Sequence, residues 1–253
     1  MTTPRVRTGP ALPHLVRKVF AELLGSAFLA TAVVGSAIAA QRLSPDDTGL
    51  ELLENSLITG AVLVALIVAL GPVSAAFNPV VTLAERFLGA ISTRAAALFI
   101  AAQVAGCCLG VMLANLMFNL SAVNISHHHR DTGGLWLGEV VATFGLVIVI
   151  FGVVRAGRSN QVAYAVAGYI TAAYWFTSST SFANPAISVG RMLSDTFAGI
   201  APSSVPMFVL MQLLGAALAV GAVIVLYPNA AEVAGDITHL DFALPTTEEP
   251  TRP

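Results

Sequence analysis

Two Asn-Pro pairs are the residues whose types and spacing point most directly to a chemical role. Asn78-Pro79 lies in the first half of the chain and Asn184-Pro185 in the second, each in a short apolar segment. Proline suits the first turn of a helix, where its missing N–H would have no partner, and asparagine is a good N-cap. Each pair therefore predicts a helix that begins at the proline, with partial positive charge and an asparagine amide at its start.

Two glutamates, Glu22 and Glu139, interrupt long apolar stretches that carry no other acidic residue. A carboxylate inside a membrane segment is costly and marks a functional position by default. A catalytic or proton-relay role is one interpretation of them, and a structural role is the other.

The remaining candidates for chemistry are weak. His127, His128 and His129 are consecutive, so they cannot all face one metal ion, and a solvated loop is the simpler interpretation. Cys107 and Cys108 are adjacent and would point apart on a helix, so we expect no disulfide between them. The sequence shows no nucleotide-binding loop, zinc-protease motif or serine–base arrangement. We therefore expect neither an enzyme nor a bound metal or cofactor.

The composition indicates a membrane protein. Of 253 residues, 56% are hydrophobic and only 10% are charged, and the mean hydropathy is +0.81. Soluble domains carry roughly 25% charged residues, so this chain could not cover its own surface in water. The net charge of −2 and the absence of a basic stripe give no sign of a nucleic-acid partner.

Six apolar stretches are long enough to cross a bilayer as helices, which takes about 20 residues. We place them at residues 16–40, 52–71, 93–119, 135–154, 161–177 and 205–227. The Asn-Pro segments between the second and third and between the fifth and sixth are too short to cross. Irregular backbone at membrane depth is tolerated where it is covered by protein or lines a watery cavity. The two short segments are therefore predicted to be re-entrant half-helices that line a pore.

Similar motifs recur in the two halves of the chain. AELLGSAFLA opens the first span and GEVVATFGLV the fourth, AAQVAG lies in the third and LMQLLG in the sixth, and FNPV recurs as ANPA. Each half has three spans, so the second half must enter from the opposite face, as in the inverted repeats of transport proteins. We assign repeat 1 to about residues 16–120 and repeat 2 to about 135–228, within a channel domain over 16–228.

The basic residues predict the orientation. Six spans put both termini on one side, where most arginines and the chain's lysine gather, and cytoplasmic loops favour such residues. We expect residues 1–15 to be a cytoplasmic segment, 229–253 a disordered cytoplasmic tail, and the protein a multi-pass protein of the plasma membrane. The basic residues assigned to the cytoplasmic side are Arg5, Arg7, Arg17, Lys18, Arg86, Arg94, Arg155, Arg158 and Arg252, and those on the other side are Arg42, Arg130 and Arg191.

These paired motifs resemble the major intrinsic proteins, the superfamily of aquaporins and aquaglyceroporins, over about Phe20 to Pro228. The resemblance implies an all-α membrane fold of six transmembrane helices plus two re-entrant half-helices, one pore in each subunit and a homotetramer. It also implies that Glu22 and Glu139 brace the half-helix loops by accepting backbone N–H bonds. The positive half-helix ends and the amides of Asn78 and Asn184 would exclude protons and cations. The first motif departs from the family pattern, because it reads Asn78-Pro79-Val80, whereas the second is Asn184-Pro185-Ala186.

The resemblance also places the four positions of the selectivity filter. By offset from the motifs they are Thr59, Ala172, Ser181 and Ile187, with Tyr174 as the alternative to Ala172. Such a ring of small and aliphatic residues has no aromatic wall, which favours a pore wider than a water-only filter.

Ile187 stands where the family normally has arginine, and Arg191 follows four residues later on the same helical face. Two interpretations are open. Arg191 reaches the mouth of the pore as a displaced filter arginine, or it anchors the outer loop together with Asp195.

We conclude from the sequence that the chain is a passive channel for small uncharged solutes and water that excludes protons and ions. The segments STSFANPA and GRMLSDTFAGIAP resemble the bacterial branch associated with arsenic-resistance operons. That resemblance adds arsenite and antimonite, as neutral hydroxides, to glycerol-like polyols. The alternatives are a water-selective aquaporin and a non-conducting structural membrane protein.

Overall fold

The computed structural model describes residues 13–227, which are helical without a strand in that range. The segment 1–12 and the tail 228–253, including Arg5, Arg7 and Arg252, lie outside the described residues. The helices are α1 (His14–Leu43), α2 (Thr48–Leu70), α3 (Pro79–Phe87), α4 (Thr93–Met117), α5 (Gly133–Arg155), α6 (Val162–Phe176), α7 (Pro185–Gly190) and α8 (Val205–Leu226), with single 3₁₀ turns at Ser159–Gln161, Arg191–Leu193 and Pro202–Ser204.

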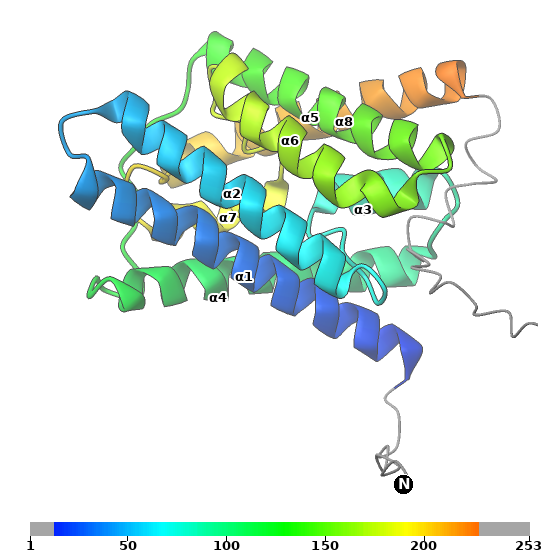
Figure 1. Ribbon diagram of the computed structural model, residues 1–253, viewed down its shortest axis with the longest axis horizontal. Coiled ribbons are helices and arrows are strands. Elements are labelled where there is room, and N and C mark those ends of the chain that lie inside the picture. The colour runs from blue at the N-terminus through cyan, green and yellow to red at the C-terminus, as the bar shows by residue number, and fades with distance from the viewer. Residues whose placement is uncertain (1–12, 228–253) are drawn as a thin grey trace, which may run out of the picture.

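Five of these helices are long and apolar enough to cross a membrane. They are α1, α2, α4, α5 and α8, the last counted together with the turn before it. The sixth expected span, α6, has 15 residues and is shorter than the usual crossing length of about 20. The polar 3₁₀ turn at Ser159–Gln161 leads directly into it. In Figure 1 the six helices run lengthwise between the same two ends of the bundle, with α1 and α2 inclined to α4.

Small residues allow the long helices to approach one another closely in both halves of the chain. A Cβ on Gly106 of α4 would lie 2.3 Å from the carbonyl oxygen of Leu23 on α1, and one on Gly110 would lie 2.1 Å from that of Ala27. In the second half, a Cβ on Gly215 of α8 would lie 2.5 Å from the Val140 carbonyl on α5. The pair α1–α4 is therefore repeated as α5–α8, with α2 and α6 joining the two pairs.

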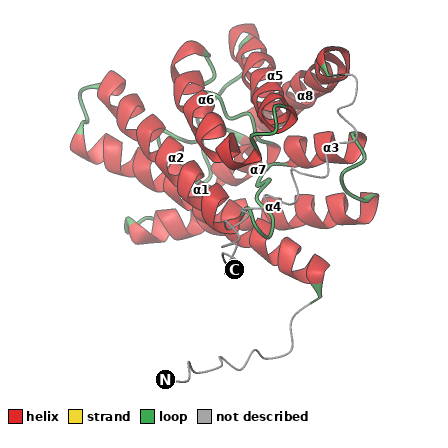
Figure 2. Ribbon diagram, turned by 45° about the vertical axis from the view of Figure 1, so that its right-hand side comes forward, coloured by secondary structure: helices red, strands yellow, loops and turns green. Residues whose placement is uncertain are grey.

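The two short helices lie between these pairs. α3 packs against α4 and α8, α7 also packs against α4 and α8, and the two contact each other. Figure 2 shows them between the α1–α4 side and the α5–α8 side of the bundle. Each half thus supplies three long helices and one short one, as the sequence predicts.

The distribution of polar and apolar side chains is that of a protein surrounded by lipid. Large apolar side chains are exposed on the outside of the bundle, including Phe20, Leu109 and Val225, whereas Glu22, Gln103 and Glu139 are fully buried. A soluble protein rarely exposes large contiguous apolar surfaces. The predicted all-α membrane fold with two half-helices is confirmed.

Candidate functional site

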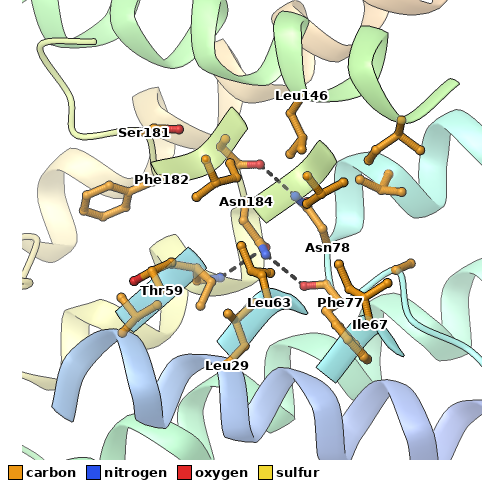
Figure 3. Close-up of a pocket in the computed structure, with 18 of the residues that line it drawn as sticks. Leu29, Thr59, Leu63, Ile67, Phe77, Asn78, Leu146, Ser181, Phe182 and Asn184 are labelled. Carbon is orange, nitrogen blue, oxygen red and sulfur yellow. Dashed lines mark hydrogen bonds between the residues drawn. The ribbon is translucent and has the colours of Figure 1, made fainter. Parts of the chain in front are cut away.

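The two Asn-Pro pairs meet at the centre of the bundle, where each asparagine binds the backbone of the other half. The Nδ2 atom of Asn78 donates to the Ala183 carbonyl at 2.8 Å, and that of Asn184 donates to the Phe77 carbonyl at 2.8 Å. Figure 3 shows these reciprocal bonds. Both carbonyls belong to residues with positive φ, 48° at Phe77 and 47° at Ala183. This left-handed backbone turns each carbonyl toward the opposite half.

The side-chain oxygens of the same asparagines cap the helices that follow. Asn78 Oδ1 accepts from the Val80 N–H at 3.0 Å, while Asn184 Oδ1 accepts from the N–H groups of Ala186 and Ile187 at 3.0 and 3.3 Å. An amide nitrogen carries two N–H donors, and one of each pair is used in the bond between the halves. The other remains for a molecule in the adjoining cavity, whose wall includes both asparagines.

Glu22 holds the loop before α3. One carboxylate oxygen accepts from the Ser74 hydroxyl and from the Ala76 N–H at 2.9 Å. The other accepts from the Phe77 N–H at 2.8 Å and from Gln103 Nε2 at 2.7 Å. The left-handed turn at Phe77 is thus tied to α1 and α4 through a single carboxylate.

Glu139 does the same for the loop before α7. Its two oxygens accept from the N–H groups of Phe182 and Ala183, each at 2.9 Å, and Gln212 Nε2 donates to one of them as well. Gln212 also donates to Ser188 on α7 at 2.9 Å, as Gln103 does to Thr82 on α3. Because backbone donors occupy both carboxylates, the geometry favours a bracing role over a proton relay.

A cavity follows the line where the two short helices meet and extends to both sides of the asparagines. Its wall is largely aliphatic, with polar groups at a few positions along its length. The lining residues include Leu29, Val33, Thr59, Leu63, Ile67, Phe77, Asn78, Val81, Glu85, Leu146, Ile150, Val162, Val166, Ile170, Tyr174, Ser181, Phe182, Asn184, Ile187 and Arg191.

Three of the four expected filter positions, Thr59, Ser181 and Ile187, lie in this wall. The placement of Ala172 is wrong, because Ala172 is exposed on the outer face of α6. Tyr174 lines the cavity in its place, and its hydroxyl lies 3.1 Å from Thr59 Oγ1 on α2. The Ser181 hydroxyl is buried without a hydrogen-bond partner among residues 13–227, so it is free to bind a molecule in the cavity.

Arg191 also lies in the cavity wall. Its Nε donates to the carbonyl of Ala198, and its guanidinium carbon stands 3.4 Å from the centre of the Phe182 ring. The expectation of a ring without an aromatic wall is therefore wrong. Tyr174 and Phe182 supply aromatic surface, and Arg191 supplies a guanidinium despite its shift of four residues from the expected position.

Asp195 does not pair with Arg191 within the described residues, because the loop between α4 and α5 occupies it. The backbone N–H of His127 donates to Asp195 Oδ1 at 2.9 Å, and His127 Nδ1 lies 3.1 Å from Oδ2. These bonds hold the pKa of Asp195 below its ordinary value, the backbone bond contributing most. His128 Nε2 lies 3.9 Å from the same carboxylate.

Two functional candidates escaped the sequence analysis, Phe182 and Glu85, whereas Tyr174 is named there as the alternative to Ala172. Glu85 lines the cavity from α3 and is 2% exposed. A signal for it existed, because Glu85 follows the motif residue Asn78 by seven residues, about two helical turns, and so falls on the same side of the half-helix. The remaining motif residues, Pro79, Val80, Pro185 and Ala186, are buried in the first turns of the two short helices. Val80 is fully buried, so the larger side chain in the first motif fits within the packing.

Two inverted half-helices whose N-termini meet inside a membrane-embedded bundle, beside a cavity lined from both halves, define the class of transmembrane solute channels. The major intrinsic protein family matches residues 11–170, and the chain belongs to this family. It is a channel for water or small solutes and not an enzyme.

The relatives agree with this assignment. The chain is 48% identical to Aquaglyceroporin AqpS of Rhizobium meliloti (strain 1021) over 206 residues, which cover 81% of this chain and 88% of the relative. It is 32% identical to human Aquaporin-5 over 154 residues, 58% of this chain and 56% of that one. The crystal structure of the aquaglyceroporin from Plasmodium falciparum superposes with a TM-score of 0.69 at 17% identity, covering 85% of this chain and 98% of that one. At that identity the similarity supports the fold alone.

Proposed function

We propose that the chain is a passive channel for small uncharged solutes, namely glycerol-like polyols, the neutral hydroxides of arsenic and antimony, and water. The observation that carries this proposal is the amphipathic ring at the α7 end of the cavity. Thr59, Tyr174 and Arg191 offer hydrogen bonds, and Ile187 and Phe182 offer apolar surface. A polyol has hydroxyl groups on an alkyl backbone, so it matches both kinds of wall at once.

Arsenite and antimonite fit the same ring. Near neutral pH they are As(OH)3 and Sb(OH)3, which are uncharged and resemble a polyol in size and in their arrangement of hydroxyl groups. The 48% identity to a relative named Aquaglyceroporin AqpS supports this solute class without identifying the solute.

Exclusion of protons and ions is supported by the centre of the cavity. Two helix N-termini meet there, and each carries about half a positive charge that repels cations. The free N–H of Asn78 and that of Asn184 would each donate to a passing water, whose oxygen would then no longer accept from a neighbouring water. A chain of waters interrupted in this way cannot relay a proton.

The site residues proposed for this channel are the two motifs, Asn78, Pro79, Val80, Asn184, Pro185 and Ala186, the filter of Thr59, Tyr174, Ser181, Ile187 and Arg191, and the braces Glu22 and Glu139. We further propose that the protein works as a homotetramer in the plasma membrane with both termini in the cytoplasm. The gathering of basic residues on the side of the termini supports this orientation.

Stopped-flow light scattering on proteoliposomes that contain the purified chain tests the proposal. Gradients of water, glycerol, urea and arsenite should give permeabilities above those of empty vesicles for water, glycerol and arsenite, without proton leak in a pH-gradient assay. A chain that passes none of them would refute the channel. A chain that passes water alone would favour the water-selective alternative. The aromatic side chains of Tyr174 and Phe182 and the guanidinium of Arg191 support this alternative, because they narrow the ring.

A further inference from the structure

Glu85 is an ionisable side chain in the cavity wall that takes no part in the contacts described above. It stands seven residues after Asn78, toward the C-terminal end of α3, and is 2% exposed. Its neighbours in the wall at this end are aliphatic, among them Ile67 at the end of α2 and Val162 at the start of α6. Glu85 is therefore an ionisable side chain among the apolar side chains of the α3 half of the cavity.

The Glu85 carboxylate lacks the partners that the two bracing glutamates have. Among residues 13–227 it makes no hydrogen bond, and no basic group lies within 4.0 Å of it. Lys18 and Glu22 on α1 act on it only at longer range, with opposite signs. The neighbouring Arg86 turns away and donates from Nε to Thr93 Oγ1 at 2.8 Å. A carboxylate in an apolar wall is costly when it has no partner. The oxygens of Glu85 are not among the fully buried unpaired side-chain atoms and belong to the cavity wall, so a molecule in the pore can bind them.

The position of Glu85 on its helix adds to that cost. Glu51 is also buried, but it lies in the first turn of α2, where the helix N-terminus stabilises a negative charge. Glu85 lies near the C-terminal end of α3, where the partial charge of the helix is negative and disfavours a carboxylate. Neither helix polarity nor pairing accounts for an acidic residue here.

We propose that Glu85 is a hydrogen-bonding site, in the α3 half of the pore, for solutes with several hydroxyl groups. This inference rests on the proposed function. A polyol that leaves the asparagines enters a section whose side chains are otherwise apolar, where its hydroxyl groups lose water and Glu85 supplies a side-chain acceptor for them. Water has less need of this group, because in single file each molecule keeps a hydrogen bond to its neighbours. Glu85 therefore favours polyol passage over water passage.

The test compares glycerol and water permeabilities of proteoliposomes containing the wild-type chain, Glu85→Leu or Glu85→Gln. Leucine removes all hydrogen bonding, so glycerol permeability should fall about tenfold, the loss expected for one hydrogen bond of this kind, while water permeability falls much less. Glutamine retains an acceptor oxygen and should keep about half of the glycerol permeability or more. Glu51→Leu is the matched control, since Glu51 is buried outside the cavity wall, and it should alter neither permeability.

Each other result overturns the inference. If the ratio of glycerol to water permeability is unchanged in Glu85→Leu, including by an equal loss of both permeabilities, then Glu85 does not distinguish polyols from water. An equal loss of glycerol permeability in Glu85→Gln and Glu85→Leu means that the side chain acts through its charge and not as an acceptor. A wild-type chain that passes water but no glycerol overturns the proposed function and this inference together. Glycerol permeability that is the same in the wild-type chain and in Glu85→Leu overturns this inference alone.

Discussion

At the scale of single residues, Ile187 and Arg191 share one cavity wall, and this arrangement leads to a prediction about selectivity. Ile187 is 5% exposed and lies one helical turn from Arg191. Ile187→Arg would place a second guanidinium in the ring and narrow it. We expect the substitution to lower glycerol or arsenite permeability about tenfold, by removing the apolar surface that the solute's alkyl or metalloid side requires, and to lower water permeability less.

The measurement is stopped-flow light scattering with parallel gradients of water and glycerol. Ile187→Leu, which keeps the apolar character and nearly the same volume, serves as the control and should preserve the ratio of the two permeabilities. Equal losses of water and glycerol in Ile187→Arg would mean that Ile187 does not contribute to the filter.

The sequence predicts residues of the site well where a motif fixes them and poorly where it does not. Asn78, Asn184, Glu22 and Glu139 are recognisable because each is polar in an apolar setting and recurs in both halves. The expected position of Ala172 is wrong because α6 is apolar on all sides. Its faces toward lipid and toward the cavity look alike in the sequence, so the rotation of the helix comes only from its packing.

At the scale of helices, the bounds of the long helices follow from the apolar stretches to within a few residues. The close crossings do not, because a glycine in an apolar run does not show which neighbour it contacts. The structure shows that Gly106 lies against α1 with no room for a side chain. A Cβ added to Gly221 on α8 would meet nothing within 4 Å, so this glycine marks the outer side of its helix.

This contrast predicts opposite effects of the same chemical change. Gly106→Ala should lower stability by about 1–3 kcal/mol, the usual cost of overpacking, and the apparent melting temperature by several degrees. Gly221→Ala should be neutral or slightly stabilising, because alanine favours helix by up to about 1 kcal/mol. Thermal unfolding of the detergent-solubilised variants measures both. Equal melting temperatures for the two variants would contradict the close α1–α4 crossing.

Asp195 connects two loops at the α7 end of the bundle, and the stability that this contact contributes should depend on pH. Hydrogen bonds from the His127 backbone and ring hold the pKa of Asp195 below its ordinary value of 3.8, with His128 also facing the carboxylate. A carboxylate whose folded pKa is lowered stabilises the fold fully above about pH 4, and this stabilisation is lost as the pH falls through the lowered pKa.

Asp195→Asn should therefore lower the melting temperature slightly at pH 5 to 7, with the difference from wild type shrinking below about pH 4. The effect is small because Asp195 is exposed to solvent screening. Asp46→Asn, at an exposed acidic residue in the turn between α1 and α2, is the control. A difference between wild type and Asp195→Asn that grows on acidification would show that the carboxylate is not stabilised by these bonds.

At the scale of the whole molecule, the charges divide between the two ends of the bundle. Arg17 and Lys18 begin α1, Arg94 begins α4, Arg155 ends α5 and Arg158 follows it, and all of these positions lie at the end where α3 also terminates. The opposite end carries the loops with Asp195 and His127–His129. Basic residues favour the cytoplasmic side, so the α3 half of the pore, with Glu85, should face the cytoplasm and the α7 half should face outward.

Cysteine labelling of intact cells tests this orientation. The native Cys107 is buried and Cys108 partly buried on α4, so both are poorly placed to react with a membrane-impermeant maleimide from either side. We expect His129→Cys, in the loop before α5, to be labelled in intact cells, and Arg158→Cys, in the turn between α5 and α6, to be labelled only after permeabilisation. Wild type, carrying the two native cysteines, gives the background. The reverse labelling pattern would show that the protein has the opposite orientation in the membrane, with the ring that contains Arg191 on the cytoplasmic side. It would leave the pore itself intact, because an inverted repeat with matching half-helices conducts a neutral solute in either orientation.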